Sequence, residues 1–365
     1  MVLEVARNLS PKTDEASRLT LNLREDIESR EIATLSPYAA LAAYSKGRKN
    51  PRPKDPYRTD FQRDRDRIIH SKAFRRLSHK TQVFIAPEGD HFRTRLTHTL
   101  EVAQIARAIA RTLRLNEDLT EAIALGHDLG HTPFGHAGET ALSEALESIQ
   151  EGYDNVPQHY HHARQALRIV DTLENDGAGL NLTFETRDGI LGHSGAHYPS
   201  TLEGQIVRIA DRIAYINHDI DDALRAHLLH EDNLPEEFCR ILGHTSGERI
   251  NTLITDLVTQ SEGQNRILMT PAVKAAMDGL RAFMFAHVYL PDRETPEQPR
   301  AQHVINSLFF FFLEHFDEIP AEFYIRAEHN KVQAVIDYVS GMTDRFALSE
   351  YARLFVPQGQ PRDGC

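Results

Sequence analysis

His127 and Asp128 are adjacent, and they begin the stretch of the chain that is richest in side chains able to do chemistry. At the end of a helix, an imidazole nitrogen and a neighbouring carboxylate oxygen can reach the same metal ion. This mixed donor set suits Mn, Mg, Fe, Co or Ni better than an ion that prefers thiolates. Two ligands are too few for a tight site, so further ligands must come from other helices.

His98 and Asp211 are the candidates for those further ligands. His98 lies among apolar residues that recur at helical spacing over 96–115, and Asp211 interrupts the apolar rhythm of a helix expected over 206–224. A carboxylate in that position is costly unless it is paired. Together with His127 and Asp128, these residues leave coordination positions for water and a substrate oxygen, an arrangement typical of metal-assisted hydrolysis. Taken alone, a His-Asp dipeptide is more often structural.

A second pair, His136 and Glu139, is spaced for acid–base work. On a helix that begins near Pro133, side chains three residues apart are neighbours. A carboxylate beside an imidazole raises its basicity and fixes its orientation, as general acid–base catalysis requires. The alternative is an ordinary pair on a helix surface.

A polar stripe follows Asp211 on the same expected helix. Tyr215 and Asp219 stand four and eight residues further along, so all three side chains share one face. The stripe could line a pocket beyond the metal, with Tyr215 against a sugar and Asp219 accepting from a hydroxyl. Alternatively, it is a hydrogen-bonded stripe buried between helices.

The elements that must position these groups are helices. Alternating strand patterns are scarce in the 365 residues, with a short hairpin expected near residues 81–94. We predict an all-α protein, a helical bundle with additional N- and C-terminal helices. Its expected parts are an N-terminal extension and basic loop over 1–60, a catalytic core over 61–230, and a C-terminal helical region over 231–365 packed on the core.

The composition excludes several classes of protein. With 41% hydrophobic and 26% charged residues, the chain is neither disordered nor fibrous. Its two cysteines cannot build a disulfide framework, which indicates a reducing cytoplasm. No apolar run is long enough for a bilayer span, and no secretory signal is visible. We expect a cytoplasmic protein with no membrane partner.

The charge is unevenly distributed. The chain carries −12, yet thirteen Lys and Arg against four Asp over residues 46–80 give a local +9. Such a segment is suited to a polyanion, either nucleic acid or the phosphates of a small molecule, and we expect it to face a polyphosphate. The alternative is a salt-bridged surface, because the four aspartates alternate with the basic residues.

Longer motifs make these patterns more specific. Three of them are Arg95-x-x-His98, His127-Asp128-x-Gly-His131-x-Pro-Phe-x-His136-x-x-Glu139 and Ala210-Asp211-x-x-Ala214-Tyr215. Upstream stand Arg63-Asp-Arg-Asp-Arg67, Phe74-Arg-Arg-Leu77 and Lys80-Thr-Gln-Val-Phe84. This ordered set resembles the HD-domain deoxynucleoside triphosphate (dNTP) triphosphohydrolases, and most of all their bacterial dGTPase-like branch. The likeness runs from about Ser36 to about Asp222.

The resemblance implies hydrolysis of a dNTP at the α-phosphorus, giving the deoxynucleoside and inorganic triphosphate. The implied metal ligands are His98, His127, Asp128 and Asp211, and the implied catalytic pair is His136 with Glu139. The implied substrate contacts are Arg95, His131 and His162 at the phosphates, Gln82 and Asp219 at the 3′-hydroxyl, Tyr215 on the deoxyribose and Val83 against a 2′-hydroxyl. The chain departs from the family at Ala163, where an asparagine usually follows the histidine that matches His162.

The same resemblance implies a homo-oligomer, a tetramer or hexamer, with an activating dNTP at a second site. Two other functions stay open on the residues alone. One is a different HD-type phosphohydrolase that acts on a nucleoside monophosphate or a signalling nucleotide. The other is a nucleotide-sensing or nucleic-acid-binding scaffold with a structural metal, for which single-stranded nucleic acid would be the partner. The complete ligand set and the His136/Glu139 pair favour the triphosphohydrolase.

Overall fold

The computed structural model describes residues 23–82, 93–226, 228–289 and 297–357. Every named element in these ranges is a helix, and the extended pairings there are two isolated bridges, Arg48 with Thr183 and Thr81 with Thr94. The all-α prediction is therefore confirmed. The second bridge joins the ends of the segment expected to form a hairpin, whose middle lies outside the described residues.

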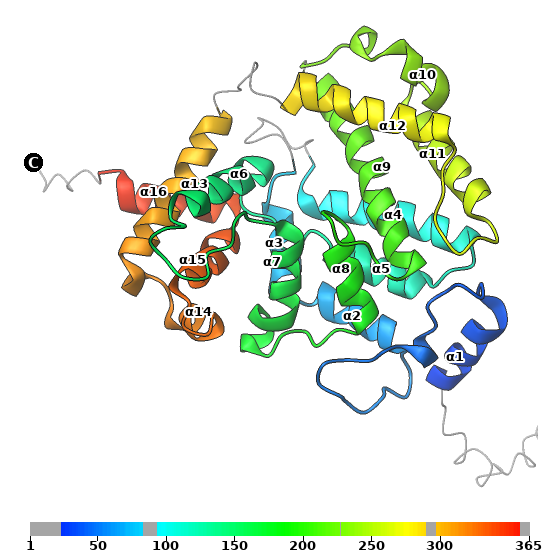
Figure 1. The fold of residues 1–365 in the computed structure, drawn as a ribbon, viewed down its shortest axis with the longest axis horizontal. Coiled ribbons are helices and arrows are strands. Elements are labelled where there is room, and N and C mark those ends of the chain that lie inside the picture. Colours follow the sequence, from blue (N-terminus) through cyan, green and yellow to red (C-terminus); the bar gives the residue numbers. More distant parts are fainter. Residues whose placement is uncertain (1–22, 83–92, 227, 290–296, 358–365) are drawn as a thin grey trace, which may run out of the picture.

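The helices form two groups (Figure 1). The first group is α1 (Leu23–Thr34), α2 (Asp60–Ile69), α3 (Lys72–Arg76), α4 (Arg95–Thr112), α5 (Glu117–Gly126), α7 (His162–Arg168), α8 (Phe184–Gly192), α9 (Leu202–Arg225), α10 (Glu236–Leu242), α11 (Ser246–Ser261) and α12 (Pro271–Met284). The second is α6 (Gly135–Ser148), α13 (Glu297–Glu314), α14 (Ala321–Arg326), α15 (Lys331–Ser340) and α16 (Asp344–Phe355). The described residues also form short 3-10 turns, at Ala42–Tyr44, Leu77–His79, Asn175–Gly177, Glu231–Asn233 and Phe316–Glu318. Two π-helices follow α7 and α12, at Ile169–Leu173 and Phe285–Tyr289.

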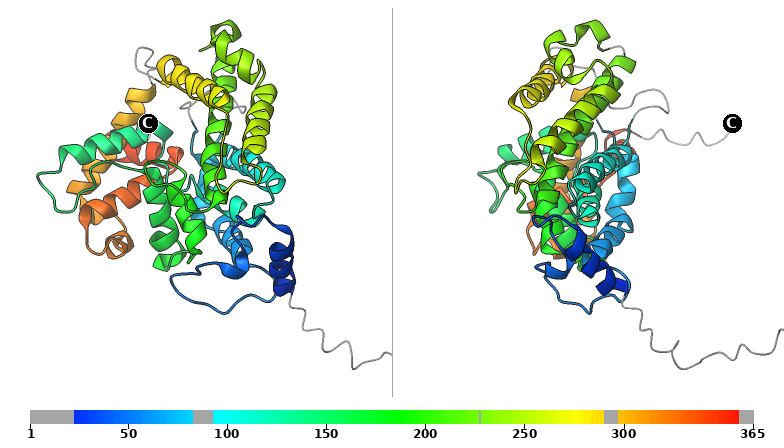
Figure 2. Two further views of the ribbon diagram at one scale, coloured as in Figure 1. Left: turned by 45° about the vertical axis from the view of Figure 1, so that its right-hand side comes forward. Right: turned by 90° about the vertical axis from the view of Figure 1, so that its right-hand side faces the viewer.

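Each group has its own hydrophobic core. The first core runs from Ala42 to Met284, with α4 packed on both α5 and α9, and α2 on α5. The second core joins α6 to α13, α15 and α16, and includes Phe134 and Tyr160. In the left view of Figure 2 the second group lies beside the first rather than around it. The division into 1–60, 61–230 and 231–365 stays a prediction.

Threonine and asparagine caps start the helices that carry the expected ligands. Thr94 accepts the Thr97 amide at the start of α4, Asn116 does the same for α5, and Thr201 for α9. The helix α6 begins at Gly135, two residues later than Pro133 suggested, because Phe134 adopts a left-handed conformation with φ 61°. No helix in the described ranges is both long and apolar enough to span a bilayer.

Gly130 allows two segments to meet at close range. A Cβ atom on this residue would lie 2.1 Å from the carbonyl oxygen of His162 and 2.3 Å from the backbone nitrogen of Ala166. Any side chain would therefore push α7 away from the loop that follows α5. The glycine is what brings His162 into the neighbourhood of His131.

Candidate metal centre and active site

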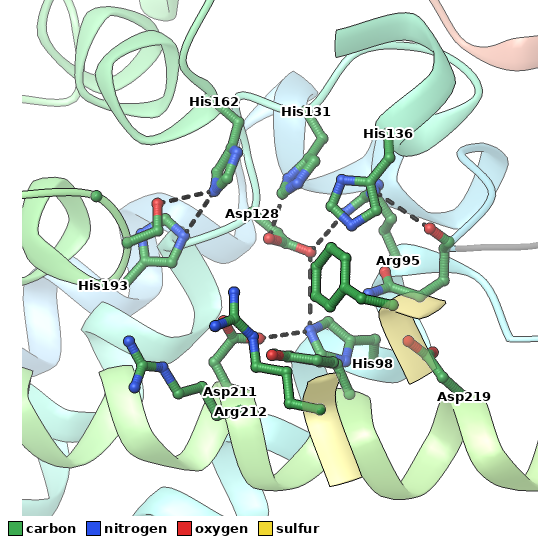
Figure 3. A pocket seen from close by; sticks show the side chains of 16 residues that line it. Arg95, His98, Asp128, His131, His136, His162, His193, Asp211, Arg212 and Asp219 are labelled. Carbon is green, nitrogen blue, oxygen red and sulfur yellow. Dashed lines mark hydrogen bonds and ion pairs between the residues drawn. The ribbon is translucent and has the colours of Figure 1, made fainter. Parts of the chain in front are cut away.

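A cavity of about 200 Å³ collects most of the residues singled out from the sequence (Figure 3). Its walls come from α4, the loop between α5 and α6, the starts of α6 and α7, the end of α8, and the middle of α9. The predicted residues that line it are Gln82, Arg95, His98, Asp128, His131, His136, His162, Asp211, Tyr215 and Asp219. His127 is fully buried behind this wall. Glu139, on α6, contacts the wall residue His162. Val83 lies outside the described residues.

The four predicted metal ligands converge at the base of the cavity. The Nε2 atom of His98 lies 3.1 Å from an oxygen of Asp211. The Nε2 atom of His127 lies 3.2 Å from Asp128 and 3.7 Å from the same Asp211 oxygen. Ligand atoms of His98, His127 and Asp128 all lie within 4.8 Å of one another, which is close enough for one ion.

The tautomer of His127 supports a bound cation. Its Nδ1 lies 2.6 Å from the carbonyl oxygen of Ala124, so Nδ1 carries the proton and donates it. Nε2 therefore points a lone pair at two carboxylates, and among the described residues it has no hydrogen-bond partner. A lone pair facing carboxylate oxygens is stable only if a proton or a metal ion lies between them. The residues present thus fit a divalent metal, with a backbone carbonyl orienting one ligand.

The charges around the candidate metal centre also favour a bound cation. Burial alone would lower the pKa of His127, but Asp128 and Asp211 raise it to about 9. Burial alone would raise the pKa of Asp128, yet His127, His131 and Arg95 hold it well below its usual range. Arg95 donates to Asp128 at 2.9 Å and to the carbonyl oxygen of Gln82 at 3.3 Å. Asp128 is consequently an anion that neighbouring groups orient toward the centre.

Glu139 contacts His162 directly. Its two oxygens lie 3.0 and 3.1 Å from Nδ1 of His162, and one also accepts the His162 backbone amide at 3.1 Å. His136 lines the cavity, where burial lowers its pKa and the charge of Glu139 opposes that shift. The direct pairing of Glu139 with His136 stays a prediction, whereas its hydrogen bonds with His162 are part of the structure.

Two parts of the chain match known protein families, and most of the chain matches named relatives. Residues 95–216 match the family model described as HD domain, and residues 267–353 match the one described as Phosphohydrolase-associated domain. A protein of Caldanaerobacter subterraneus subsp. tengcongensis, named deoxyguanosinetriphosphate triphosphohydrolase-like protein, is 54% identical over 338 residues, which cover 92% of this chain and 97% of the relative. One of the same name from Desulfatibacillum aliphaticivorans is 47% identical over 357 residues, covering 92% and 99%.

The chain belongs to the deoxyguanosinetriphosphate triphosphohydrolase-like family. The HD domain and the names of these relatives support a phosphohydrolase. HD domains bind divalent metals, and the His/Asp cluster provides a place for one in this dGTPase-like chain. All four predicted metal ligands lie within residues 95–216, the range that matches the HD domain.

The structure adds cavity residues that the sequence did not reveal. His193 follows α8, and its Nδ1 lies 2.7 Å from the carbonyl oxygen of Ile190, which leaves Nε2 facing the cavity 3.2 Å from Nε2 of His162. Its only signal in the sequence is the glycine-flanked run from Gly192 to Gly195. Arg212, Arg281, Phe285 and Ser194 also line the cavity. Arg281 and Phe285 come from α12 and the π-helix after it, and no spacing in the sequence connects them to the HD motifs.

The basic segment over 46–80 does not contribute its charges to this cavity. None of its thirteen Lys and Arg is among the lining residues, although the segment ends two residues before Gln82. Several of its side chains instead pair with carboxylates: Arg48 with Asp60 and Asp64, Lys49 with Asp171, Arg58 with Asp55 and Asp66, and Arg65 with Asp118 and Glu121. The expectation that it faces a polyphosphate is not met at this cavity, and the salt-bridged alternative describes the segment.

Asp219 is expected to destabilise the protein as the pH rises. Burial, followed by the nearby charges of Asp222 and Asp211, raises the pKa of Asp219 well above its usual range. Between the unfolded-state pKa and this raised value the native state binds more protons, so the free energy of unfolding falls with increasing pH. We expect Asp219→Asn to reduce this loss, giving a higher stability than the wild type at pH 8. Urea denaturation from pH 5 to 9 measures the effect, and an unchanged pH dependence would contradict it.

Proposed function

We propose that this protein is a metal-dependent dNTP triphosphohydrolase that releases inorganic triphosphate from a deoxynucleoside triphosphate. The observation that supports this proposal most is a single cavity that combines a His/Asp cluster suited to a divalent ion with His131, His136 and His162. The names of the dGTPase-like relatives point to the same reaction. An activating dNTP at a second site, a tetramer or hexamer, contact with single-stranded nucleic acid and a cytoplasmic location remain expectations beside it.

The metal would be held by His98, His127, Asp128 and Asp211. When bound, such an ion polarises a phosphoryl oxygen and lowers the pKa of water. The protein groups then have separable roles. His131 and His162 lie on the same side of the cavity, with their rings stacked at a centroid distance of 4.0 Å, where they can contact the α-phosphate. Arg281 and Arg212 bring positive charge to the triphosphate, which carries several negative charges to be offset.

His136 is the group we assign to proton transfer. Hydrolysis at the α-phosphorus forms a bond from the water oxygen to phosphorus and breaks the bond to O5′ of the deoxynucleoside. The water must lose a proton and O5′ must gain one. Because burial lowers the pKa of His136, its imidazole is neutral at pH 7 and able to accept a proton and return it.

Product analysis tests the proposal directly. The full chain is incubated with each dNTP singly and with all four together, with Mn²⁺ or Mg²⁺ and with a chelator. Metal-dependent release of deoxynucleoside with intact triphosphate supports the proposed reaction, and a higher rate in the mixture indicates activation. Monophosphate, diphosphate or simple phosphate as the first product would indicate another HD-type phosphohydrolase. A metal-loaded protein without turnover would indicate a sensing or scaffold role.

Gln82 is expected to bind substrate without contributing to the metal centre. Its Oε1 is buried at the cavity and has no hydrogen-bond partner among the described residues, so it can accept from a substrate hydroxyl. We expect Gln82→Ala to raise KM by about tenfold, the effect of losing one such bond, with metal content unchanged. Steady-state kinetics and metal analysis measure both quantities, and Ser78→Ala, which changes a side chain outside the cavity, serves as the control. Loss of metal from Gln82→Ala would mean that the pocket is misplaced.

A further inference from the structure

A buried lysine, Lys80, holds the loop that carries the cavity histidines. Its side chain is 3% exposed, and its Nζ donates to the carbonyl oxygen of His131 at 2.5 Å and to that of Ser340 at 2.8 Å. His131 lies in the loop between α5 and α6, whereas Ser340 ends α15 in the second helix group. One cation thus connects the active-site loop to the C-terminal helices.

Asp344 makes the reciprocal connection at the start of α16. One of its oxygens accepts the backbone amide of Phe134 at 3.0 Å. The other accepts the backbone amide of Thr81 at 2.8 Å and the Thr81 hydroxyl at 2.5 Å. All three donors come from segments that form the cavity wall. The carboxylate therefore has a role beyond favouring the N-terminus of its own helix.

Phe134 is a constrained residue of this loop. Its φ of 61° lies in the left-handed region, which is unfavourable for a residue with a side chain and must be stabilised by its surroundings. Its ring is 3% exposed and packs in the second core with helices α13, α15 and α16. Phe134 stands between His131 and His136, so fixing it fixes the separation of the two histidines.

The segment that carries Gln82 is tied to the same two residues. Lys80 and Thr81 directly precede Gln82, and the Lys80 carbonyl accepts the Arg95 amide at 3.0 Å. A Cβ on Gly135 would lie 2.9 Å from the carbonyl oxygen of Gln82, which shows that this segment packs tightly against the start of α6. The segment that carries Gln82 and the loop that carries His131 and His136 are thus both held by Lys80 and Asp344.

We propose that Lys80 and Asp344 are positioning residues through which the C-terminal helices fix the active-site loop, and with it the placement of His131, His136 and Gln82. Neither residue lines the cavity, so each acts through the backbone that it holds. The catalytic consequence rests on the proposed function, but the restraint on the loop can be measured without turnover.

Hydrogen exchange of the loop is the deciding measurement. In Asp344→Asn, an N–H₂ group replaces one acceptor oxygen, so the side chain can no longer accept from the Phe134 amide and the Thr81 amide at the same time. We expect faster amide exchange in peptides covering 130–136 and 81–82, and a fall in kcat of about tenfold to a hundredfold because the reacting groups are less well placed. Metal content should stay at the wild-type level, since no metal ligand is changed.

Lys80→Met provides a second variant that is expected to fold well. Burial lowers the pKa of Lys80 to about 7, which means that the site stabilises the cation poorly, and an uncharged side chain of similar length should be accommodated. Relief of the buried charge offsets part of the cost of leaving the carbonyls of His131 and Ser340 without their donor. We expect a melting temperature close to that of the wild type, with faster exchange over 130–136 and a reduced kcat. A variant that is stable yet slower cannot be explained by general unfolding.

Asp337→Asn is the matched control for Asp344→Asn. Asp337 is a buried aspartate of the second helix group, whereas Asp344 is half-buried. Asp337 accepts from Arg168 at 2.6 Å, Gln165 at 3.0 Å and Gln333 at 2.9 Å, none of which lies in the loop. It should lower the melting temperature and leave exchange over 130–136 unchanged. The proposal is overturned if Asp344→Asn and Lys80→Met show exchange over 130–136 no faster than this control. If the wild type hydrolyses no dNTP, the exchange comparison still decides the proposal.

Discussion

Replacing His127 or Asp211 with alanine is expected to abolish metal binding and hydrolysis together. Each contributes an atom to the cluster in which Nε2 of His127 faces the carboxylates of Asp128 and Asp211, so each variant leaves at most three of four ligands. Since changing even an outer partner of a metal ligand costs about 10- to 100-fold in affinity or activity, losing a ligand should cost more than about 100-fold. Metal per chain, measured by elemental analysis after dialysis, should fall with the rate.

Thermal unfolding gives a second reading of the same prediction. A ligand that binds only the native state raises the melting temperature, so a chelator should lower it for the wild type. The chelator should have no effect on His127→Ala or Asp211→Ala, because these variants hold no ion. The control His303→Ala removes an α13 histidine that does not line the cavity and whose Nε2 lies 3.1 Å from the Tyr351 hydroxyl, and it should behave as the wild type. Full metal occupancy in Asp211→Ala would place the ion elsewhere.

The sequence predicts that the four candidate metal ligands converge because two simple signals combine. Helical periodicity places His98 on α4 and Asp211 on α9, and the apolar residues around them require that these helices pack together. A polar side chain on the packed face of each helix must then find a partner, and the His127-Asp128 pair at the end of α5 provides it. Residue type and periodicity are enough in this case because the contacts lie between neighbouring helices of one core.

The sequence predicts less where a distant segment supplies the contact. Arg281 reaches the cavity from α12, and no periodicity relates α12 to the HD motifs. The basic segment shows the converse error. Its charge could be counted from the sequence, but its partners Asp118 and Asp171 lie 50 residues or more away along the chain, so their neutralising effect is visible only in three dimensions.

Glu139 illustrates how a tertiary contact competes with a local one. Its spacing from His136 places the two side chains on one face of α6, as the sequence predicts. The close approach at Gly130, however, brings the start of α7 against the same carboxylate, which accepts both the side chain and the backbone amide of His162. Two hydrogen bonds with good geometry orient Glu139 more firmly than helical proximity does.

His136→Ala is expected to keep the metal and lose most of the turnover. His136 lines the cavity but is not one of the residues whose atoms form the His98, His127 and Asp128 cluster. Removing a general acid–base group costs about 10²- to 10⁴-fold in rate, so we expect a fall in kcat of that size with metal content and the chelator response preserved. Hydrolysis at the wild-type rate would show that the proton-transfer role is assigned to the wrong residue.

Glu139→Gln then separates the two partners of Glu139. If the carboxylate tunes the basicity of His136, Glu139→Gln should shift the pH profile of kcat, and adding it to His136→Ala should cause no further loss. If it mainly orients His162, Glu139→Gln should instead be non-additive with His162→Ala, because each variant removes the same hydrogen bonds. The bonds of 3.0 and 3.1 Å to His162 favour the second outcome. In that case the proton transfer assigned to His136 does not depend on Glu139, and burial, which lowers the pKa of His136, favours the neutral imidazole that can accept a proton.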